Sequence, residues 1–252
     1  MTPQLFLVPE LAVQPVAGDV IELTGQEARH AATVKRLELG EVVLLADGGG
    51  TLIEARSTAV GRDRISFAVL SVRSEPEPQP RFVMVQAVPK GERADLAVQA
   101  LTELGADEIV AWSAARSISL WRGADKVDKG LAKWRRTALE ASKQSRRARI
   151  PVVTGLASTE EIANRVSETI ASGSAAFVLH EAATEPLAGR PLPSAGVLMV
   201  IIGPEGGVSD EELQTLTAAG AVAVRLGPAV LRTSTAGAAA LAVLSVRVGR
   251  WK

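Results

Sequence analysis

The sequence contains no cysteine and no tyrosine, only two histidines, and 3% aromatic residues among 252 positions. The absence of cysteine excludes disulfides, thiolate metal sites and cysteine nucleophiles. A metal site built from several histidines is excluded as well, because His30 and His180 are the only two. So few aromatic rings also disfavour a protein that works only by stacking single-stranded bases. We therefore expect no metal.

Long apolar runs are also missing. None approaches the roughly 20 residues that a membrane-spanning helix needs. The opening residues, MTPQLFLVPEL, lack the basic start and apolar centre of a signal peptide. The composition of 47% hydrophobic and 22% charged residues is that of an ordinary globular protein. We therefore expect a cytoplasmic protein with no membrane partner.

The formal net charge is zero, yet one segment is strongly basic. Residues 124–150 contain nine Lys or Arg against three Asp or Glu. A solvated helix surface is the plain interpretation of such a segment. The tract SKQSRRAR within it has four cations and no acid between them, which favours an anion-binding patch.

A proline-spaced segment, RSEPEPQPR, divides the chain into two parts of different pattern. Short apolar runs with turn signals, and one helical stretch over about 25–37, predict a small, mostly β domain at 1–73. Residues 74–80 form the predicted linker. Over 81–252 apolar strands alternate with helices, which predicts a mostly parallel α/β sheet.

The stretch VLMVIIGPEGGVSDEEL, residues 197–213, combines a buried strand with a glycine loop and a helix start. Its six apolar residues suit a strand that is buried on both faces, and Ser209 with Glu212 forms a capping-box pattern. Open α/β sheets bind ligands at this kind of strand end.

The charges of this loop narrow the choice of ligand. A phosphate would be repelled by its four carboxylates, and no Lys–Ser/Thr pair follows the glycines. The loop therefore favours a neutral or cationic ligand over a nucleoside phosphate. The four acids are Glu205, Asp210, Glu211 and Glu212.

A second loop, LGPAVLRTSTAGAAAL at 226–241, leads into a helix of very small residues. Small side chains let another backbone or a ligand approach closely. Taken singly, each loop could equally be a plain turn beside a tightly packed helix.

Together the two loops resemble the paired cofactor loops of the RsmE family, ribosomal RNA uridine-N3 methyltransferases of the SPOUT superfamily. The resemblance covers the whole chain: HAATVKRLELGEVVLLADGGG is similar to that family's PUA-like domain, and VPKGERADLAVQALTELGADEI and EASKQSRRARIP follow in the family's order. The chain departs from the family pattern at Ala115, Ala229 and Ser234.

The resemblance implies S-adenosylmethionine as cofactor, 16S rRNA or the small ribosomal subunit as partner, a homodimer, and a C-terminal trefoil knot. It implies cofactor contacts from the two loops and from the strand end before them: Leu179, His180, Ile202, Gly203, Pro204, Glu205, Gly206, Gly207, Leu226, Gly227, Leu231, Thr233, Thr235 and Ala236. It implies RNA contacts from basic residues in both domains: Arg29, His30, Arg36, Lys90, Arg93, Arg116, Arg146, Arg147 and Arg149.

Methylation at N3 requires loss of the uracil imide proton. A cation near a uracil carbonyl would stabilise the resulting anion, and Arg232 is the candidate for this catalytic role. No residue in the motifs identifies itself as the general base. For Glu205, ligand binding and bracing of the loop are equal alternatives, whereas His180 is better interpreted as a lining residue than as a base.

Three alternatives stand beside this function. A Rossmann-type nucleotide enzyme is disfavoured, because no G-x-G-x-x-G opens a helix with an acid about 20 residues later. A non-catalytic RNA-binding protein would leave two cofactor-like loops without a purpose. A related SPOUT methyltransferase with another target nucleotide would share every motif.

Overall fold

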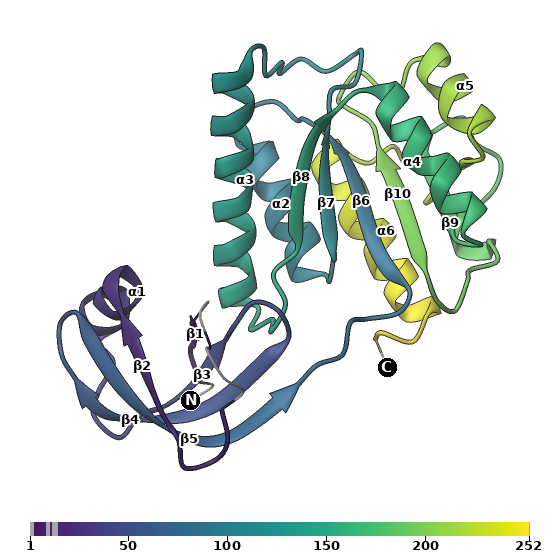
Figure 1. The fold of residues 1–252 in the computed structure, drawn as a ribbon. Helices are drawn as coiled ribbons and strands as arrows, with labels where there is room; N and C mark the ends of the chain where they lie inside the picture. Colours follow the sequence, from purple (N-terminus) through teal and green to yellow (C-terminus); the bar gives the residue numbers. More distant parts are fainter. Residues whose placement is uncertain (1–2, 9–10, 12–14, 252) are drawn as a thin grey trace. The chain divides into compact units, whose positions relative to one another are not determined.

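The computed structural model describes residues 3–8, 11 and 15–251. The chain forms two compact units (Figure 1). The first comprises Met1–Glu77 and Ser142–Ile150, and the second comprises Pro78–Ala141 and Pro151–Lys252. The sequence-based division at 73 and 80 lies close to this boundary but assigned 142–150 to the second domain. Among the described residues, no helix is long and apolar enough to cross a membrane.

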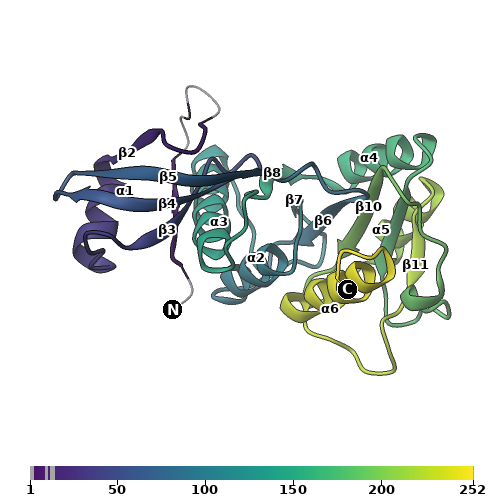
Figure 2. The same ribbon diagram turned by 90° about the horizontal axis from the view of Figure 1, so that it is seen from below.

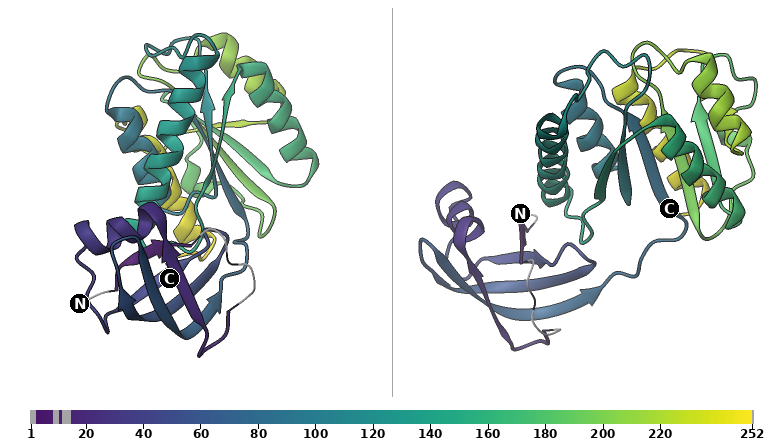
Figure 3. Two further views of the ribbon diagram at one scale, coloured as in Figure 1. Left: turned by 60° about the vertical axis from the view of Figure 1, so that its left-hand side comes forward. Right: turned by 45° about the horizontal axis from the view of Figure 1, so that its top comes forward.

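The first unit is built on a five-stranded sheet in the order β1-β3-β4-β5-β2. The strands β2, β3, β4 and β5 pair antiparallel, whereas β1 pairs parallel with β3. Two register shifts in the β4–β5 ladder bend these long strands, which Figure 3 shows. The bounds are β1 Leu5–Leu7, β2 Val20–Thr24, β3 Val42–Ala46, β4 Thr51–Val60 and β5 Arg64–Ser74.

The helical stretch predicted at 25–37 is present as α1, Gly25–Arg29, followed by a π-helical turn, His30–Val34. It packs through Ala28 and Ala31, both fully buried, onto the apolar face of the sheet. The basic Arg29 on the other side of this stretch remains exposed, because the sheet covers only the side that carries Ala28 and Ala31.

The segment Ser142–Ile150 belongs to the first unit because it pairs with the glycine turn after β3. Gly50 N–H donates to Ala148 O at 3.2 Å, and Ile150 N–H donates to Gly48 O at 3.0 Å. A Cβ on Gly50 would lie 2.7 Å from the backbone oxygen of Glu75, and Gly50 has φ +118°, so only glycine fits there. A Cβ on Gly48 would lie 2.8 Å from Ile150 Cδ1. Close approach of the chain therefore accounts for Gly48 and Gly50.

An ion pair and a hydrogen-bonded carboxylate stabilise this segment and the glycine turn. Lys143 Nζ pairs with Glu27 Oε1 at 2.9 Å, and both side chains are largely buried. The Asp47 carboxylate accepts from Gly49 N–H at 2.7 Å and Thr51 N–H at 2.9 Å. Desolvation raises the pKa of Asp47, but its hydrogen bonds outweigh this effect and hold the pKa below its ordinary value. Its contribution to stability is therefore present above the unfolded pKa and is lost as the pH falls through the folded pKa.

The second unit contains a six-stranded sheet in the order β11-β9-β10-β6-β7-β8, in which every pair is parallel. The predicted parallel α/β sheet is confirmed. Its strands are β6 Arg81–Ala87, β7 Glu108–Trp112, β8 Val152–Ala157, β9 Ala175–Leu179, β10 Val197–Ile202 and β11 Val222–Val224. Its α-helices are α2 Arg93–Glu103, α3 Ala124–Gln144, α4 Thr159–Ala171, α5 Asp210–Ala218 and α6 Thr233–Arg247, with a short 3-10 turn at Leu187–Gly189.

The helices cover both faces of this sheet. One core cluster packs α2, α3 and α6 against one face, and a second cluster packs α4 and α5 against the other. Figure 2 shows α4 on the side opposite to α2 and α6. A Cβ on Gly237 would lie 2.9 Å from Leu101 Cδ2, so the small residues of α6 are needed for its close contact with α2. Layers on both faces explain why the strands are continuously apolar.

The end of α6 is clamped by Arg250. The helix ends at Arg247. Gly249, which has φ +74°, lies in the turn after it, and Arg250 follows. The guanidinium of Arg250 lies over the Phe82 ring at 3.8 Å and donates to Asp107 Oδ2 at 2.6 Å. It also donates to Gly105 O at 3.0 Å. One side chain thereby joins the C-terminal turn to the beginnings of β6 and β7.

We expect Arg250→Ala to lower the free energy of unfolding by about 3 kcal/mol, because it removes the guanidinium that donates to the buried Asp107 carboxylate. Urea denaturation measures this loss. The exposed Arg122 provides the control, since Arg122→Ala should cost less than about 0.5 kcal/mol. Equal losses in the two variants would contradict the clamp.

Candidate functional site

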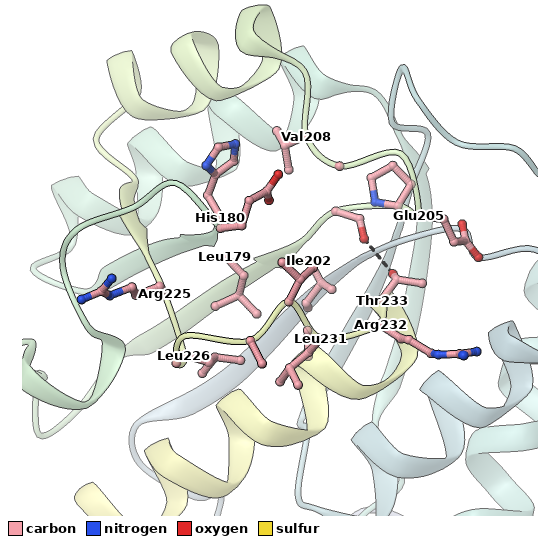
Figure 4. A pocket seen from close by; sticks show the side chains of 18 of the residues that line it. Leu179, His180, Ile202, Glu205, Val208, Arg225, Leu226, Leu231, Arg232 and Thr233 are labelled. Atoms are coloured by element: carbon pink, nitrogen blue, oxygen red, sulfur yellow. Dashed lines mark hydrogen bonds between the residues drawn. The ribbon is translucent and has the colours of Figure 1, made fainter.

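A cavity of about 500 Å³ lies at the carboxyl ends of β9, β10 and β11 (Figure 4). Three loops line it, with contributions from Arg93 on α2 and Ala236 on α6. Of the cofactor residues expected from the sequence, all but Thr235 are in its lining: Leu179, His180, Ile202, Gly203, Pro204, Glu205, Gly206, Gly207, Leu226, Gly227, Leu231, Thr233 and Ala236. Thr235 is exposed one turn into α6.

Hydrogen bonds from Thr233 hold two of these loops together. Its hydroxyl donates to Gly203 O at 2.7 Å and accepts from Gln86 Nε2 at 2.9 Å (Figure 4 shows the first of these bonds). Gln86 is completely buried on β6, and Thr233 is the first residue of α6. The ends of β6 and β10 are thereby fixed to the start of α6.

Each glycine of the loop at 203–207 is required for a different structural reason. A Cβ on Gly203 would lie 2.8 Å from Val208 Cγ2, and one on Gly206 would lie 2.9 Å from Arg116 Cβ and 3.0 Å from Arg116 O. Gly207 has φ +75°, a conformation that favours glycine. The tight fit of Gly206 therefore comes from the neighbouring Arg116 backbone, and the positive φ belongs to Gly207.

Glu205 braces the loop with one oxygen and leaves the other unpaired. Its Oε1 accepts from Lys90 N–H at 3.1 Å and lies 3.8 Å from Arg93 Nη1. Its Oε2 is buried and has no hydrogen-bond partner among the described residues. Bracing of the loop by Glu205 is thus observed, and ligand binding by its second oxygen stays a prediction.

His180 lies at the end of β9 and lines the cavity. Its N–H donates to Val224 O at 2.9 Å, and its Nδ1 accepts from Ala182 N–H at 3.3 Å. These bonds hold the loop after β9 against the end of β11. The contacts support its interpretation as a lining residue.

The cavity combines an apolar interior with a charged rim. Leu179, Ile202, Leu226 and Leu231 gather in the middle of the view in Figure 4, whereas Arg225 and Arg232 extend to opposite sides. Arg232 is the exposed N-cap residue of α6, and among the described contacts its guanidinium makes no hydrogen bond or ion pair.

Several lining residues were not predicted from the sequence: Glu181, Val208, Val224, Arg225, Pro228, Ala229 and Val230. Arg225 had been interpreted only as part of a strand. It directly follows the last residue of β11, so its place at a parallel strand end was the available signal. Arg93, predicted to contact RNA, also lines the cavity.

The other residues predicted to contact RNA are distributed over both units. In the first unit, Arg29 pairs with Asp63, while Arg36 and Arg146 are exposed and are the two non-glycine residues with positive φ in the described chain. In the same unit His30 and Arg147 are partly buried. Arg149 Nη2 donates to Glu75 O at 2.6 Å, so part of its guanidinium is engaged within the first unit. In the second unit, Lys90 and Arg116 are exposed near Glu205 and Gly206 respectively.

Among the described residues, no group of three or more His, Asp or Glu is arranged to hold a metal ion. A volume of this size, with an apolar interior and few polar groups, is typical of cofactor and small-molecule sites.

Two family models match the chain. The RNA methyltransferase domain matches residues 75–245, and the RNA methyltransferase PUA domain matches residues 23–70. The protein of Mycobacterium bovis named Ribosomal RNA small subunit methyltransferase E is 48% identical over 251 residues, which cover 100% of this chain and 94% of the relative. The protein of the same name from Bacillus subtilis is 28% identical, with 88% of each chain covered.

Solved structures agree in fold. A Ribosomal RNA small subunit methyltransferase E from Neisseria gonorrhoeae, bound to S-adenosyl methionine, has 27% identity and a TM-score of 0.85 over 98% of both chains. A methyltransferase from Legionella pneumophila in complex with the same cofactor has 27% identity and a TM-score of 0.84, again over 98% of both chains. The family resemblance expected from the motifs is confirmed, and the chain belongs to the RNA methyltransferase family, with its PUA domain at the N-terminal end.

Proposed function

We propose that this protein transfers the methyl group of S-adenosylmethionine to N3 of a uridine in 16S rRNA. The observation that carries the proposal is the cavity at 179–181, 202–208 and 224–233, which is formed by the loops whose motifs match the family. Full-length relatives named as small-subunit ribosomal RNA methyltransferases support the substrate, and structures bound to S-adenosyl methionine support the cofactor.

The residues of the cavity fit this cofactor. Its interior offers apolar side chains and glycine-loop backbone, and its lining carries the carboxylates of Glu181 and Glu205. The unpaired Glu205 Oε2 can accept a hydrogen bond from a ligand hydroxyl or ammonium. A Cβ on Gly227 would meet no atom within 4 Å, which leaves open space on that side. A cationic ligand without phosphate suits these groups.

When bound, S-adenosylmethionine supplies an electrophilic methyl group on a sulfonium. The loops at 203–207 and 226–232 hold the cofactor, and Arg232 lies at their rim where the substrate base would enter. Its guanidinium can donate to a uracil carbonyl oxygen and stabilise the negative charge that follows loss of the N3 proton. Positioning of the two reactants would provide much of the remaining acceleration.

The RNA is proposed to contact basic residues of both units. The exposed Arg36 and Arg146 lie in the first unit, and Lys90, Arg93 and Arg116 surround the glycine loop in the second. A homodimer, a trefoil knot at the C-terminal end and a cytoplasmic location are further parts of the proposal, carried by the family resemblance.

The proposed function is tested by mapping N3-methyluridine in small-subunit ribosomal RNA from cells with and without the protein. Loss of one modified uridine without the protein, and its restoration by the purified protein with the cofactor, are the expected results. A modification at another base or another uridine atom would show a related methyltransferase with a different target. Unchanged RNA with no cofactor binding would indicate a non-catalytic protein.

We expect Arg232→Ala to lower kcat about 10²-fold, by analogy with removal of one oxyanion donor, while cofactor affinity changes less than about threefold. Single-turnover methylation and calorimetric titration of the cofactor measure the two quantities. A turnover within a few-fold of the wild type would show that the Arg232 side chain has no catalytic role.

We expect Arg146→Ala to reduce the slope of log affinity against log salt by about 0.7 to 0.9, because one phosphate contact is lost. Arg149→Ala should instead destabilise the first unit, since it removes the hydrogen bond to Glu75 O. Filter binding of RNA at several salt concentrations, beside thermal unfolding, separates the two effects. If Arg146→Ala leaves the salt slope unchanged, this segment is not part of the RNA contact.

A further inference from the structure

Glu212 has a buried carboxylate that serves more than its own helix. The residue is 5% exposed and lies in the first turn of α5. Its Oε2 accepts from Ser209 N–H at 3.1 Å, which completes the capping box. Its Oε1 accepts from Ala115 N–H at 2.8 Å and from Thr159 Oγ1 at 3.0 Å, on two other loops. Helix capping accounts for only one of these three bonds.

The network continues beyond Glu212. Trp112 Nε1, at the end of β7, donates to Thr159 Oγ1 at 3.2 Å, so the Thr159 hydroxyl relays between a buried indole and the carboxylate. The ends of β7, the start of α4 and the start of α5 are thereby joined. Each bond has a charged or hydroxyl acceptor, which makes the network costly to interrupt.

The residue held by this network is Arg116. Its neighbour Ala115 is bound to Glu212, and Ser117 N–H donates to Ala114 O at 3.0 Å, which closes the turn. On the other side, the Arg116 backbone lies against Gly206, where a Cβ would be 3.0 Å from its carbonyl oxygen. The turn is thus enclosed between Glu212 and the glycine loop, while Arg116 itself is exposed.

The charge of Arg116 reaches the same helix turn. Glu211 has its pKa lowered chiefly by its own backbone N–H and by the Ser209 hydroxyl, with a smaller contribution from the positive charge of Arg116. The geometry itself places the Arg116 backbone beside Gly206 of the glycine loop. A cation carried by this turn is suited to an RNA phosphate or a base edge near the cavity.

We propose that Glu212 is a positioning residue for RNA methylation, because it fixes the Ala114–Ser117 turn so that Arg116 is held beside the cofactor loop. The inference rests on the proposed RNA substrate. A carboxylate is required since both of its oxygens face N–H or O–H donors; the amide of a glutamine would turn its own N–H₂ toward at least one of them.

The test is a double-mutant cycle between Glu212→Gln and Arg116→Ala, with Ser209→Ala as the matched control. Ser209→Ala weakens the same capping box but leaves the bond to Ala115 in place. The quantities measured are kcat/KM for the RNA and Kd for S-adenosylmethionine, with thermal unfolding to establish that each variant is folded.

Glu212→Gln should reduce kcat/KM for the RNA about tenfold or more, as expected for a lost charged hydrogen bond, with the cofactor Kd within about twofold of wild type. Ser209→Ala should change kcat/KM less than about threefold. In the Arg116→Ala background, Glu212→Gln should cause no more than about a twofold further loss. If Glu212→Gln does not fold, Thr159→Val removes one bond to the carboxylate without touching the cap and should show the same dependence on Arg116.

Three results would overturn the inference. Equal effects of Glu212→Gln and Ser209→Ala, or full additivity with Arg116→Ala, would reduce Glu212 to a helix cap. If Glu212→Gln weakened S-adenosylmethionine binding by the same factor as kcat/KM for the RNA, Glu212 would act on the glycine loop and not through Arg116. Wild-type RNA turnover in Arg116→Ala alone would instead contradict the proposed RNA contact of Arg116. A failure of the proposed RNA contact is thereby distinguished from a failure of the role proposed for Glu212.

Discussion

The hydrogen bonds of the Thr233 hydroxyl are the constraint on which the cavity depends. They connect three chain segments that are distant in sequence: the end of β6 through Gln86, the end of β10 through Gly203, and the start of α6. Because Gln86 is completely buried, these bonds are shielded from water and difficult to replace. The second loop of the cavity is held to the first through this one side chain.

Two of the four acidic groups near the glycine loop form hydrogen bonds within the protein. Glu212 binds the turn before Arg116, and one oxygen of Glu205 binds the Lys90 backbone. The sequence suggested that four acids select against phosphate. In the structure these two acids are partly or wholly committed to internal hydrogen bonds, so the number of acids in the sequence overstates the negative charge that is free to face a ligand.

Local patterns in the sequence predicted the elements well, and contacts between distant segments explain what they missed. Ser158 with Glu161 and Ser209 with Glu212 form the two capping boxes, and the Ser209 box was predicted from spacing alone. β1 was missed because it has only three residues. The close fit at Gly48 and Gly50 could not be predicted locally, because Ile150 and Arg149, which approach these glycines, come from about 100 residues later.

The same distinction applies to the site. The motif loops indicated most of the lining residues, because the lining comes from contiguous segments. Glu181 was missed because it lies one residue beyond the matched Leu179 and His180. Arg225 was missed because contacts were expected only from Leu226 onward. The need for glycine at 206 could not be predicted, because the Arg116 backbone that causes it comes from a different loop.

The central claim, that the Thr233 hydrogen bonds assemble the cofactor cavity, is tested most directly by calorimetric titration of S-adenosylmethionine into Thr233→Val. This change keeps the side-chain shape and removes both hydrogen bonds. The exposed Thr217, which donates only within its own helix, gives the matched control Thr217→Val. We predict a loss of cofactor affinity of at least about tenfold in folded Thr233→Val and none in the control. Wild-type affinity in Thr233→Val would contradict the account.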